Sequence, residues 1–300
     1  MPSATLAKQL NIVLIAGPDS HYYGAHDFEG GVKFLAKALK EASSDISVKT
    51  AFGGWPEDSS IFDNADAVII YSDGLAKHIL NQDNKHVLEK LHEKGVGIGF
   101  LHYACTVEKD DLGPEFLEWI GGYYEPYWSV NPKWVAGFRK LPKHPVTRGV
   151  RPFTIYDEWY YHMRFRVEMK DVTPLLTAVP PEKTRQKKDG AHSGNPHVRA
   201  RTGMPEHVAW VALGDDKQRG FGLTGLHYHW NLAHPYLQKF MLNACVWLAG
   251  GKIPEDGLPI QKVTFQDMVD INPGEPDARW NREVKDLWEA KIDEWNQLTP

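Results

Sequence analysis

Short apolar runs alternate with segments of helical periodicity as far as residue 110, and this alternation restricts the fold more than any other feature of the sequence. The apolar runs are Leu10–Ala16, Ala65–Tyr71 and Val96–Leu101, and Ile46–Phe52 alternates with period two. Between them, Phe28–Ala42 and the segment around Leu88 repeat apolar residues at the spacing of one buried helix face. Strands that alternate with helices predict an α/β fold: a doubly wound, mostly parallel sheet with helices on both faces.

The rest of the chain is less regular. We expect further strands at Val208–Leu213 and Gly220–Thr224, and helices at Pro114–Trp119 and Pro235–Leu248. Residues 180–206 hold Pro, Gly and basic residues without periodicity, which predicts a solvated loop. We therefore divide the chain into an α/β domain over residues 1–251 and an extension over residues 252–300, rich in proline at its start.

A final amphipathic helix is predicted in this extension. Its apolar stripe consists of Trp280, Val284, Leu287, Trp288, Ile292 and Trp295. Such a stripe packs either on its own domain or on a neighbouring subunit, and the sequence leaves both open. Three tryptophans on one face are costly to leave in water, so a homo-oligomer is expected.

Composition excludes several classes of protein. The 34 basic and 39 acidic residues give a net charge of −5, without the basic excess of a nucleic-acid-binding protein. No apolar stretch approaches the roughly 20 residues needed to span a bilayer. The N-terminus lacks the features of a signal peptide, so we expect a cytoplasmic protein, or a periplasmic one if such a peptide has been removed.

Histidine is abundant and cysteine is rare, with 14 and two residues. This ratio excludes a disulfide scaffold and a cysteine-rich zinc module. Cys105 and Cys245 are expected to be separate buried thiols. The sequence also lacks the glycine-rich fingerprints of NAD and nucleotide sites, so neither cofactor is expected.

Histidines gather where the predicted strands end. His21 and His26 follow the first strand, Asp73 follows the third, and His102 comes directly after Val96–Leu101. His227 and His229 follow Gly220–Thr224. Because ligands bind at the carboxyl ends of parallel strands, this edge of the sheet is the predicted site.

His102 stands at a turn that resembles a nucleophile elbow, where a hydrolase would carry serine or cysteine. Histidine is a poor covalent nucleophile but a good metal ligand, base or acid. His227 and His229 would point the same way on an extended backbone and, with His102, could bind a divalent metal: Zn, Mn or Fe. A chance His-x-His pair is the alternative.

The segment Asp157-Glu158-Trp159-Tyr160-Tyr161-His162 sets two carboxylates beside aromatic rings. Acids that bind hydroxyl groups and rings that stack on sugar faces together suit a carbohydrate site. An edge strand of alternating exposure is the alternative interpretation.

Several motifs, in order, are similar to the ThuA-like (trehalose-utilisation) family. They include GVGIGFLHYA, FLEWIGGYYE, KHPVTRGVRPFTIYDEWYYHMRF and GFGLTGLHYHWN, and the resemblance runs from about residue 10 to about residue 265. It implies a flavodoxin-like sheet of the class I glutamine amidotransferase type, with His102 where a catalytic cysteine would stand. It also implies a role in sugar catabolism, next to a dehydrogenase that oxidises a glycoside to its 3-keto form.

The chemistry of a 3-keto-glycoside suggests roles for these residues. The ketone acidifies the C2 proton, so that a base can remove it and the C1 aglycone can leave by β-elimination, with or without rehydration. His21 is the expected base, with Asp157 or Glu158 as acid, and His102, His227 and His229 as metal ligands. The expected substrate contacts are His26, Asp73, Tyr124, Trp128, Tyr160 and Trp230.

Two other functions remain open at this point. One is a non-catalytic carbohydrate-binding or scaffold protein that keeps the fold without the chemistry. The other is a metal-dependent hydrolase or isomerase acting on another polar metabolite.

Overall fold

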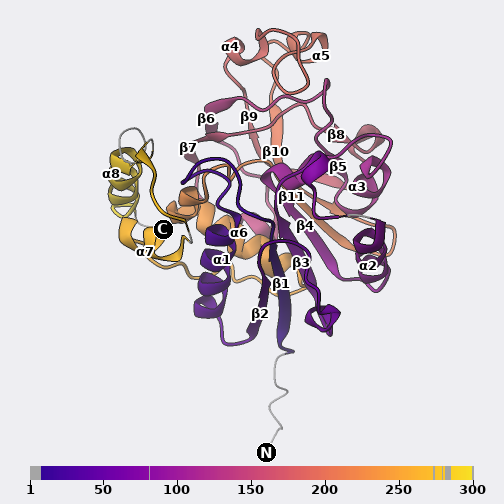
Figure 1. The fold of residues 1–300 in the computed structure, drawn as a ribbon, viewed down its shortest axis with the longest axis vertical. Coiled ribbons are helices and arrows are strands. Elements are labelled where there is room, and N and C mark those ends of the chain that lie inside the picture. Colours follow the sequence, from indigo (N-terminus) through magenta and orange to yellow (C-terminus); the bar gives the residue numbers. More distant parts are fainter. Residues whose placement is uncertain (1–7, 81, 273, 279, 281–284, 299–300) are drawn as a thin grey trace, which may run out of the picture.

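The computed structural model describes residues 8–80, 82–272, 274–278, 280 and 285–298, and a seven-stranded mixed sheet lies at its centre (Figure 1). Across the sheet the strands are β2 (Ile46–Ala51), β1 (Leu10–Ala16), β3 (Ala67–Tyr71), β4 (Gly97–Leu101), β11 (Arg219–Leu223), β10 (Glu206–Leu213) and β9 (Val172–Ala178). The first five are parallel, and β10 runs antiparallel to both of its neighbours, β11 and β9. The predicted doubly wound, mostly parallel sheet is thereby confirmed.

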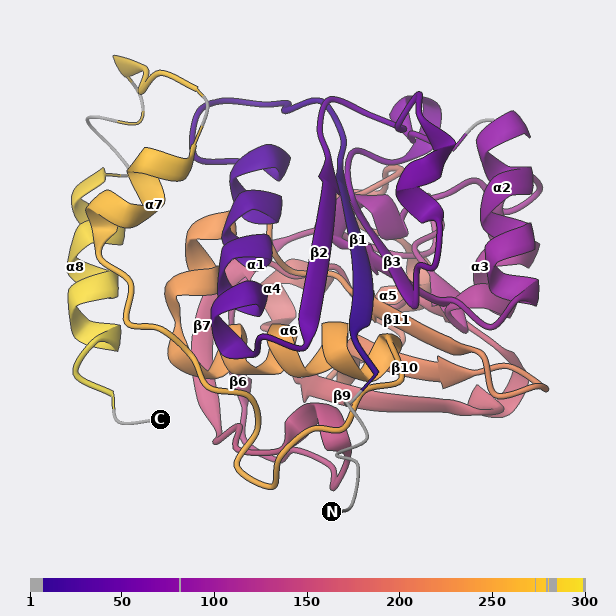
Figure 2. The ribbon, with the colours of Figure 1, turned by 90° about the horizontal axis from the view of Figure 1, so that it is seen from below.

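Helices cover both faces of this sheet (Figure 2). One face carries α1 (Phe28–Ala42) and α6 (Pro235–Leu248), and the other carries α2 (Gln82–Glu93) and α3 (Gly113–Trp119). Strand β1 shows why its sequence is a continuous apolar run: Ile12 and Leu14 pack on the α1 side, whereas Val13 and Ile15 pack on the α2 side.

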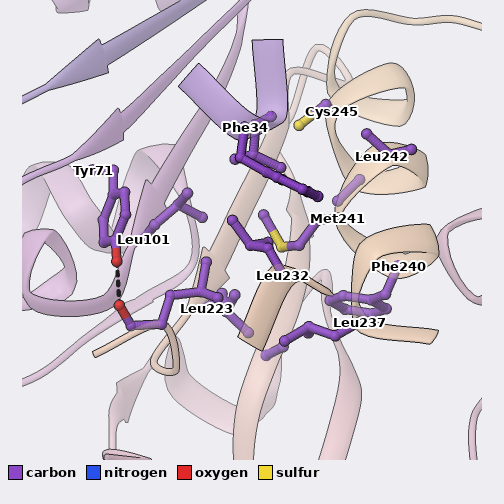
Figure 3. Packing of buried hydrophobic residues seen from close by; sticks show 14 of the residues in the cluster. Phe34, Tyr71, Leu101, Leu223, Leu232, Leu237, Phe240, Met241, Leu242 and Cys245 are labelled. Atoms are coloured by element: carbon purple, nitrogen blue, oxygen red, sulfur yellow. Dashed lines mark hydrogen bonds between the residues drawn. The ribbon is translucent and has the colours of Figure 1, made fainter. Parts of the chain in front are cut away.

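The core on the α1 side joins segments far apart in the sequence. Phe34 from α1 lies near Met241 and Leu242 from α6, with Leu101 and Leu223 from the ends of β4 and β11 beside them (Figure 3). All five are buried. Their burial fixes the positions of the strand ends, where the site residues follow.

Two small antiparallel ribbons lie beyond the carboxyl edge of the sheet. One pairs β5 (Gly122–Tyr123) with β8 (Arg164–Phe165), and the other pairs β6 (Lys133–Phe138) with β7 (Phe153–Glu158). Short 3-10 turns connect many of the elements, among them one at His102–Cys105 and one at His229–Ala233. Strand β7 carries the DEWYY motif's two carboxylates, Asp157 and Glu158, to this edge.

The expectation of a solvated loop over residues 180–206 holds only in part. This segment contains α4 (Glu182–Arg185) and α5 (Pro196–Arg199), and it holds the fully buried Arg185. The Arg185 guanidinium donates to Glu206 Oε1 at 2.9 Å. Lys183, Lys187, Lys188 and Asp189 are exposed, as the composition predicts, and the buried pair of Arg185 with Glu206 is the feature that composition did not reveal.

The C-terminal extension folds onto its own domain through α7 (Phe265–Ile271) and α8 (Lys285–Trp295). Trp288, Ile292 and Trp295 are buried there, whereas Leu287 is 48% exposed and Val284 lies outside the described residues. Because these tryptophans are covered by their own domain, the apolar stripe is no longer a reason to expect a homo-oligomer. The homo-oligomer itself stays a prediction. Within the described ranges, no helix has the length and apolar character to cross a bilayer.

Candidate functional site

Loops at the ends of four parallel strands, together with β7, converge on one cluster of side chains. They supply His21 and His26 after β1, Asp73 after β3, His102 after β4 and His227 after β11. Three of these histidines have left-handed backbones, with φ of 69° at His21, 54° at His26 and 55° at His102. Such conformations are strained for residues with a Cβ atom and persist where the surrounding structure enforces them.

His102 is fully buried and held at both ring nitrogens. Its Nδ1 lies 2.8 Å from the Thr224 carbonyl oxygen, so Nδ1 carries the proton and donates. Its Nε2, which then bears the lone pair, lies 3.0 Å from the Tyr160 hydroxyl and 3.0 Å from His26 Nε2. Burial, together with the neighbouring imidazoles of His26 and His227, holds the pKa of His102 well below its usual value.

Cys105, three residues beyond His102, is not an activated thiol. It is fully buried and donates to the Phe100 carbonyl oxygen at 3.3 Å. Burial raises its pKa well above the usual value for cysteine. The elbow therefore presents a neutral imidazole and no nucleophile.

His26 bridges two elements of the site. Its Nδ1 lies 3.0 Å from Asp73 Oδ1, and the Ser20 hydroxyl donates to the same oxygen at 3.0 Å. Burial opposes ionisation of Asp73, but the hydrogen bond and charge of His26 outweigh it and lower the Asp73 pKa. Both residues were expected to contact substrate, yet their side chains are buried and contact each other.

His227 and Glu158 complete the buried cluster. Glu158 Oε2 lies 3.3 Å from His227 Nδ1 and 3.7 Å from His102 Nε2. Burial raises the pKa of Glu158, against the opposing charge of Lys133, and burial lowers the pKa of His227 strongly. One ligand atom each from His26, His102, His227 and Glu158 fall within 4.8 Å of one another, which is close enough to hold a metal ion.

His21 lies at the mouth of this cluster. It is exposed, its ring centroid is 3.7 Å from that of His26, and its Nδ1 is 3.0 Å from the Ser20 hydroxyl. Partial burial and the charge of His26 lower the pKa of His21. The ring is therefore neutral near pH 7 and available to accept a proton.

His229 does not join the cluster as expected. The backbone enters a 3-10 turn at His229, so His227 and His229 do not share one face. His229 is fully buried 3.6 Å from Asp27 instead, and burial lowers its pKa to about 3. Of the expected trio, only His102 and His227 belong to the cluster, and His26 and Glu158 join them in place of His229.

Asp157 supports the site without facing it. Its carboxylate accepts from the backbone amides of Leu226 at 2.6 Å and Glu158 at 2.8 Å, and from Asn231 Nδ2 at 2.9 Å. Burial raises its pKa to about 6. Asp157 therefore positions the loop that carries His227, and its role as the acid stays a prediction.

The four aromatic residues expected to form a sugar platform are mostly covered. Trp230 is fully buried, with the rings of Trp280 and Phe265 packed against it at centroid distances of 4.7 Å and 5.6 Å. Trp128 has the Arg164 guanidinium 3.3 Å from its ring and His162 stacked at 4.5 Å. A ring whose faces are occupied by the protein cannot stack on a sugar.

Tyr124 and Tyr160 are also buried, but their hydroxyls point toward polar groups of the site. Tyr124 contacts His192 Nδ1 at 3.0 Å, and Tyr160 contacts His102. His192 belongs to residues 180–206, and no motif in the sequence marks it as a site residue. That segment's folding brings it to the site.

Lys133 is a site residue that the sequence did not reveal. It lies directly opposite Glu158 in the β6–β7 register, and its Nζ donates to the Tyr228 hydroxyl at 3.0 Å. Tyr228 in turn lies 3.3 Å from the Tyr22 hydroxyl. A pairing of β6 with the DEWYY strand would have pointed to Lys133, but the sequence carries no hairpin signal for it.

Comparison with known proteins agrees with the predicted family. The ThuA model, described as trehalose utilisation, matches residues 13–248. A putative ThuA-like protein from Bacteroides uniformis is similar in structure, with 18% identity, a TM-score of 0.58 and coverage of 84% of this chain and 98% of that chain. A second, from Parabacteroides merdae, has 14% identity, a TM-score of 0.53 and coverage of 85% and 98%.

A glutamine amidotransferase from Thermotoga maritima matches more weakly, with 10% identity, a TM-score of 0.39 and coverage of 97% of this chain and 99% of that chain. No curated protein is significantly similar in sequence.

Proposed function

The chain belongs to the ThuA family of trehalose-utilisation proteins, and we propose that it is an enzyme of sugar catabolism that cleaves glycosides already oxidised to a ketone at C3. A base removes the acidified C2 proton, the C1–O bond breaks, and the aglycone leaves as an alcohol once its oxygen is protonated. Addition of water to the resulting enone gives net hydrolysis. A sugar 3-dehydrogenase must supply the substrate.

One arrangement carries the proposal: a neutral histidine stands at the mouth of a buried cluster of imidazoles and a carboxylate. His21 is the base, because its lowered pKa leaves the ring unprotonated near pH 7. Beneath it, the Nε2 atoms of His26 and His102 lie 3.0 Å apart, close enough to share a proton or to hold a cation. A positive charge held there would stabilise the enolate oxygen that forms at C3.

The proton for the leaving oxygen comes from Lys133. Its Nζ hydrogen-bonds to the Tyr228 hydroxyl, which fixes the ammonium group beside Glu158 at the rim of the cluster. Burial raises the pKa of Tyr228, so this hydroxyl stays neutral and orients the lysine. Lys133 takes the role that Asp157 was expected to play.

Release of 4-nitrophenol from a 4-nitrophenyl 3-keto-glucoside tests the proposal, with the unoxidised glucoside as the control substrate. We expect cleavage of the keto substrate alone, slower turnover when C2 carries deuterium, and a loss of about 100-fold or more in kcat for His21→Ala. His86→Ala, on the surface of α2, is the matched control and keeps wild-type turnover.

Cleavage by His21→Ala at the wild-type rate would refute the assignment of the base. Binding of keto sugars without any release would favour the non-catalytic carbohydrate-binding function.

A further inference from the structure

We infer that His26, His102, His227 and Glu158 form a binding site for one divalent transition-metal ion. This inference goes beyond the proposed function, since the ion would bind whether or not the substrate is a keto sugar. The ligand atoms come from three strand-end loops and from β7, and they lie within 4.8 Å of one another. All four side chains are largely removed from solvent.

The first support is an unfavourable meeting of lone pairs. His102 donates from Nδ1 to Thr224, so its Nε2 carries a lone pair. His26 Nδ1 lies 3.0 Å from the Asp73 carboxyl oxygen Oδ1, an acceptor, so its proton lies there and its Nε2 also carries a lone pair. These two Nε2 atoms are 3.0 Å apart. Two electron pairs at that distance repel each other unless a cation lies between them.

The second support is that the buried imidazole of His227 lacks hydrogen-bond partners among the described residues. Within the described part of the chain, neither of its ring nitrogens has a hydrogen-bond partner, although its side chain is only 3% exposed. A buried polar group without a partner costs about 1–3 kcal/mol. Glu158 adds a buried carboxylate 3.3 Å from His227 Nδ1. A metal ion would satisfy the imidazole and neutralise the carboxylate together.

The third support is the set of groups behind the ligands. Metal-binding histidines usually give their second ring proton to a carboxylate or a backbone carbonyl, which fixes the tautomer and the ring direction. His26 is held in this way by Asp73, and His102 by the Thr224 carbonyl oxygen. When the metal takes the His102 lone pair, the Tyr160 hydroxyl becomes free to donate to an oxygen bound beside it.

The donor set narrows the choice of metal. Three imidazole nitrogens and one carboxylate oxygen suit Zn²⁺, Fe²⁺ or Mn²⁺, whereas Ca²⁺ and Mg²⁺ prefer sites made of oxygen alone. Soft copper(I) would require sulfur ligands, and both cysteines are buried elsewhere. His229 does not belong to this donor set, because its Nδ1 lies 3.6 Å from Asp27 Oδ2.

Metal titration of the chelator-treated full chain tests this inference without any sugar. We expect Zn²⁺ and Mn²⁺ to bind at one ion per chain by calorimetry, and Co²⁺ to give the visible absorption of a nitrogen-ligated ion. His227→Ala should weaken binding by about 100-fold or more, because even loss of a group behind a ligand costs 10–100-fold. His227 has no hydrogen bond to lose within the described residues, so its removal should spare the fold, which circular dichroism checks.

Glu158→Gln is the second variant, and it should weaken binding while keeping the shape of the side chain. His192→Ala is the matched control, because His192 lies beside Tyr124 and outside the four ligands, so wild-type affinity is expected. Wild-type affinity in folded His227→Ala and Glu158→Gln, or no binding of any of the three ions by the wild type, would overturn the inference. Metal binding without cleavage of keto sugars would contradict only the proposed function. Cleavage of keto sugars by a wild-type chain that binds none of the three ions would contradict only the metal site.

Discussion

Replacing Glu206 by glutamine should destabilise the protein more than any other single loss of charge in residues 180–206. Glu206 is 4% exposed and its Oε1 accepts from Arg185 at 2.9 Å and from Arg201 at 2.7 Å. Without it, fully buried Arg185 keeps the carbonyl oxygens of Met204 and Val198 as acceptors and only the partly exposed Glu182 as a counter-charge, 3.6 Å from its Nε. Glu206→Gln thus removes the nearer and better buried of the two counter-charges of this guanidinium.

The size of the effect follows from this burial. Removing one partner of a buried ion pair typically costs about 3–5 kcal/mol, because the remaining charge stays desolvated. Glutamine still offers one neutral acceptor, which recovers about 1 kcal/mol. We therefore expect the free energy of unfolding to fall by about 2–4 kcal/mol.

Urea unfolding at pH 7, followed by tryptophan fluorescence, measures this loss. The matched control is Asp189→Asn in the same segment, because Asp189 pairs with Arg199 at 2.6 Å but is well exposed to solvent. No measurable loss is expected there. If Glu206→Gln is no less stable than Asp189→Asn, the buried ion pair does not hold this segment together.

Three further predictions concern the core and its titration. Trp288→Ala removes a buried ring that packs 5.4 Å from that of Tyr228 and should cost about 3–5 kcal/mol in urea unfolding; a loss below 1 kcal/mol would mean that α8 does not pack there. Burial, with nearby arginines, lowers the pKa of His144 to about 4. Between pH 6.5 and 4 the unfolded chain therefore binds a proton at His144 that the folded chain does not, and the free energy of unfolding falls as the pH falls through that window. His144→Asn keeps a side-chain acceptor for the cap but does not titrate in this range. From pH 7 to pH 5 its free energy of unfolding should fall by about 1 kcal/mol less than that of the wild type, after allowance for solvent screening. Equal losses in the two proteins would contradict the lowered pKa of His144. Cys105 and Cys245 are buried, and burial raises the pKa of both thiols, to about 12 for Cys245. A thiol reagent should therefore label them only when the chain unfolds. Rapid labelling of the native chain would contradict the burial of these two thiols.

The sheet and its helices were predictable because their signals are local. Strand β1 must bury both of its faces, so its sequence is a continuous apolar run, and α1 buries one face, so its apolar residues recur at helical spacing. Residues 180–206 were predictable only in part. Several of their charged residues are exposed, as the local composition indicates, whereas Arg185 and Glu206 pair with each other in the interior.

Part of the site was predictable as well, since the carboxyl ends of parallel strands must meet at one edge. That rule places His21, His26, His102 and His227 together, as the structure has them. It does not say which way a ring points. The 3-10 turn at His229 and the covered faces of the predicted sugar-stacking aromatics were settled by contacts that no spacing in the sequence records.

The sequence by itself determined the doubly wound sheet, the family and the edge of the sheet where chemistry is expected, because hydrophobic periodicity and strand order are properties of the chain read locally. The tertiary structure alone decided which donor atoms meet. His26 Nε2 faces His102 Nε2 because Asp73 and the Thr224 carbonyl oxygen hold the opposite nitrogens, and Lys133 reaches the rim because β6 pairs with β7. Hydrogen bonds between residues so distant in sequence depend on the folded backbone, and they set the chemistry that the site can perform.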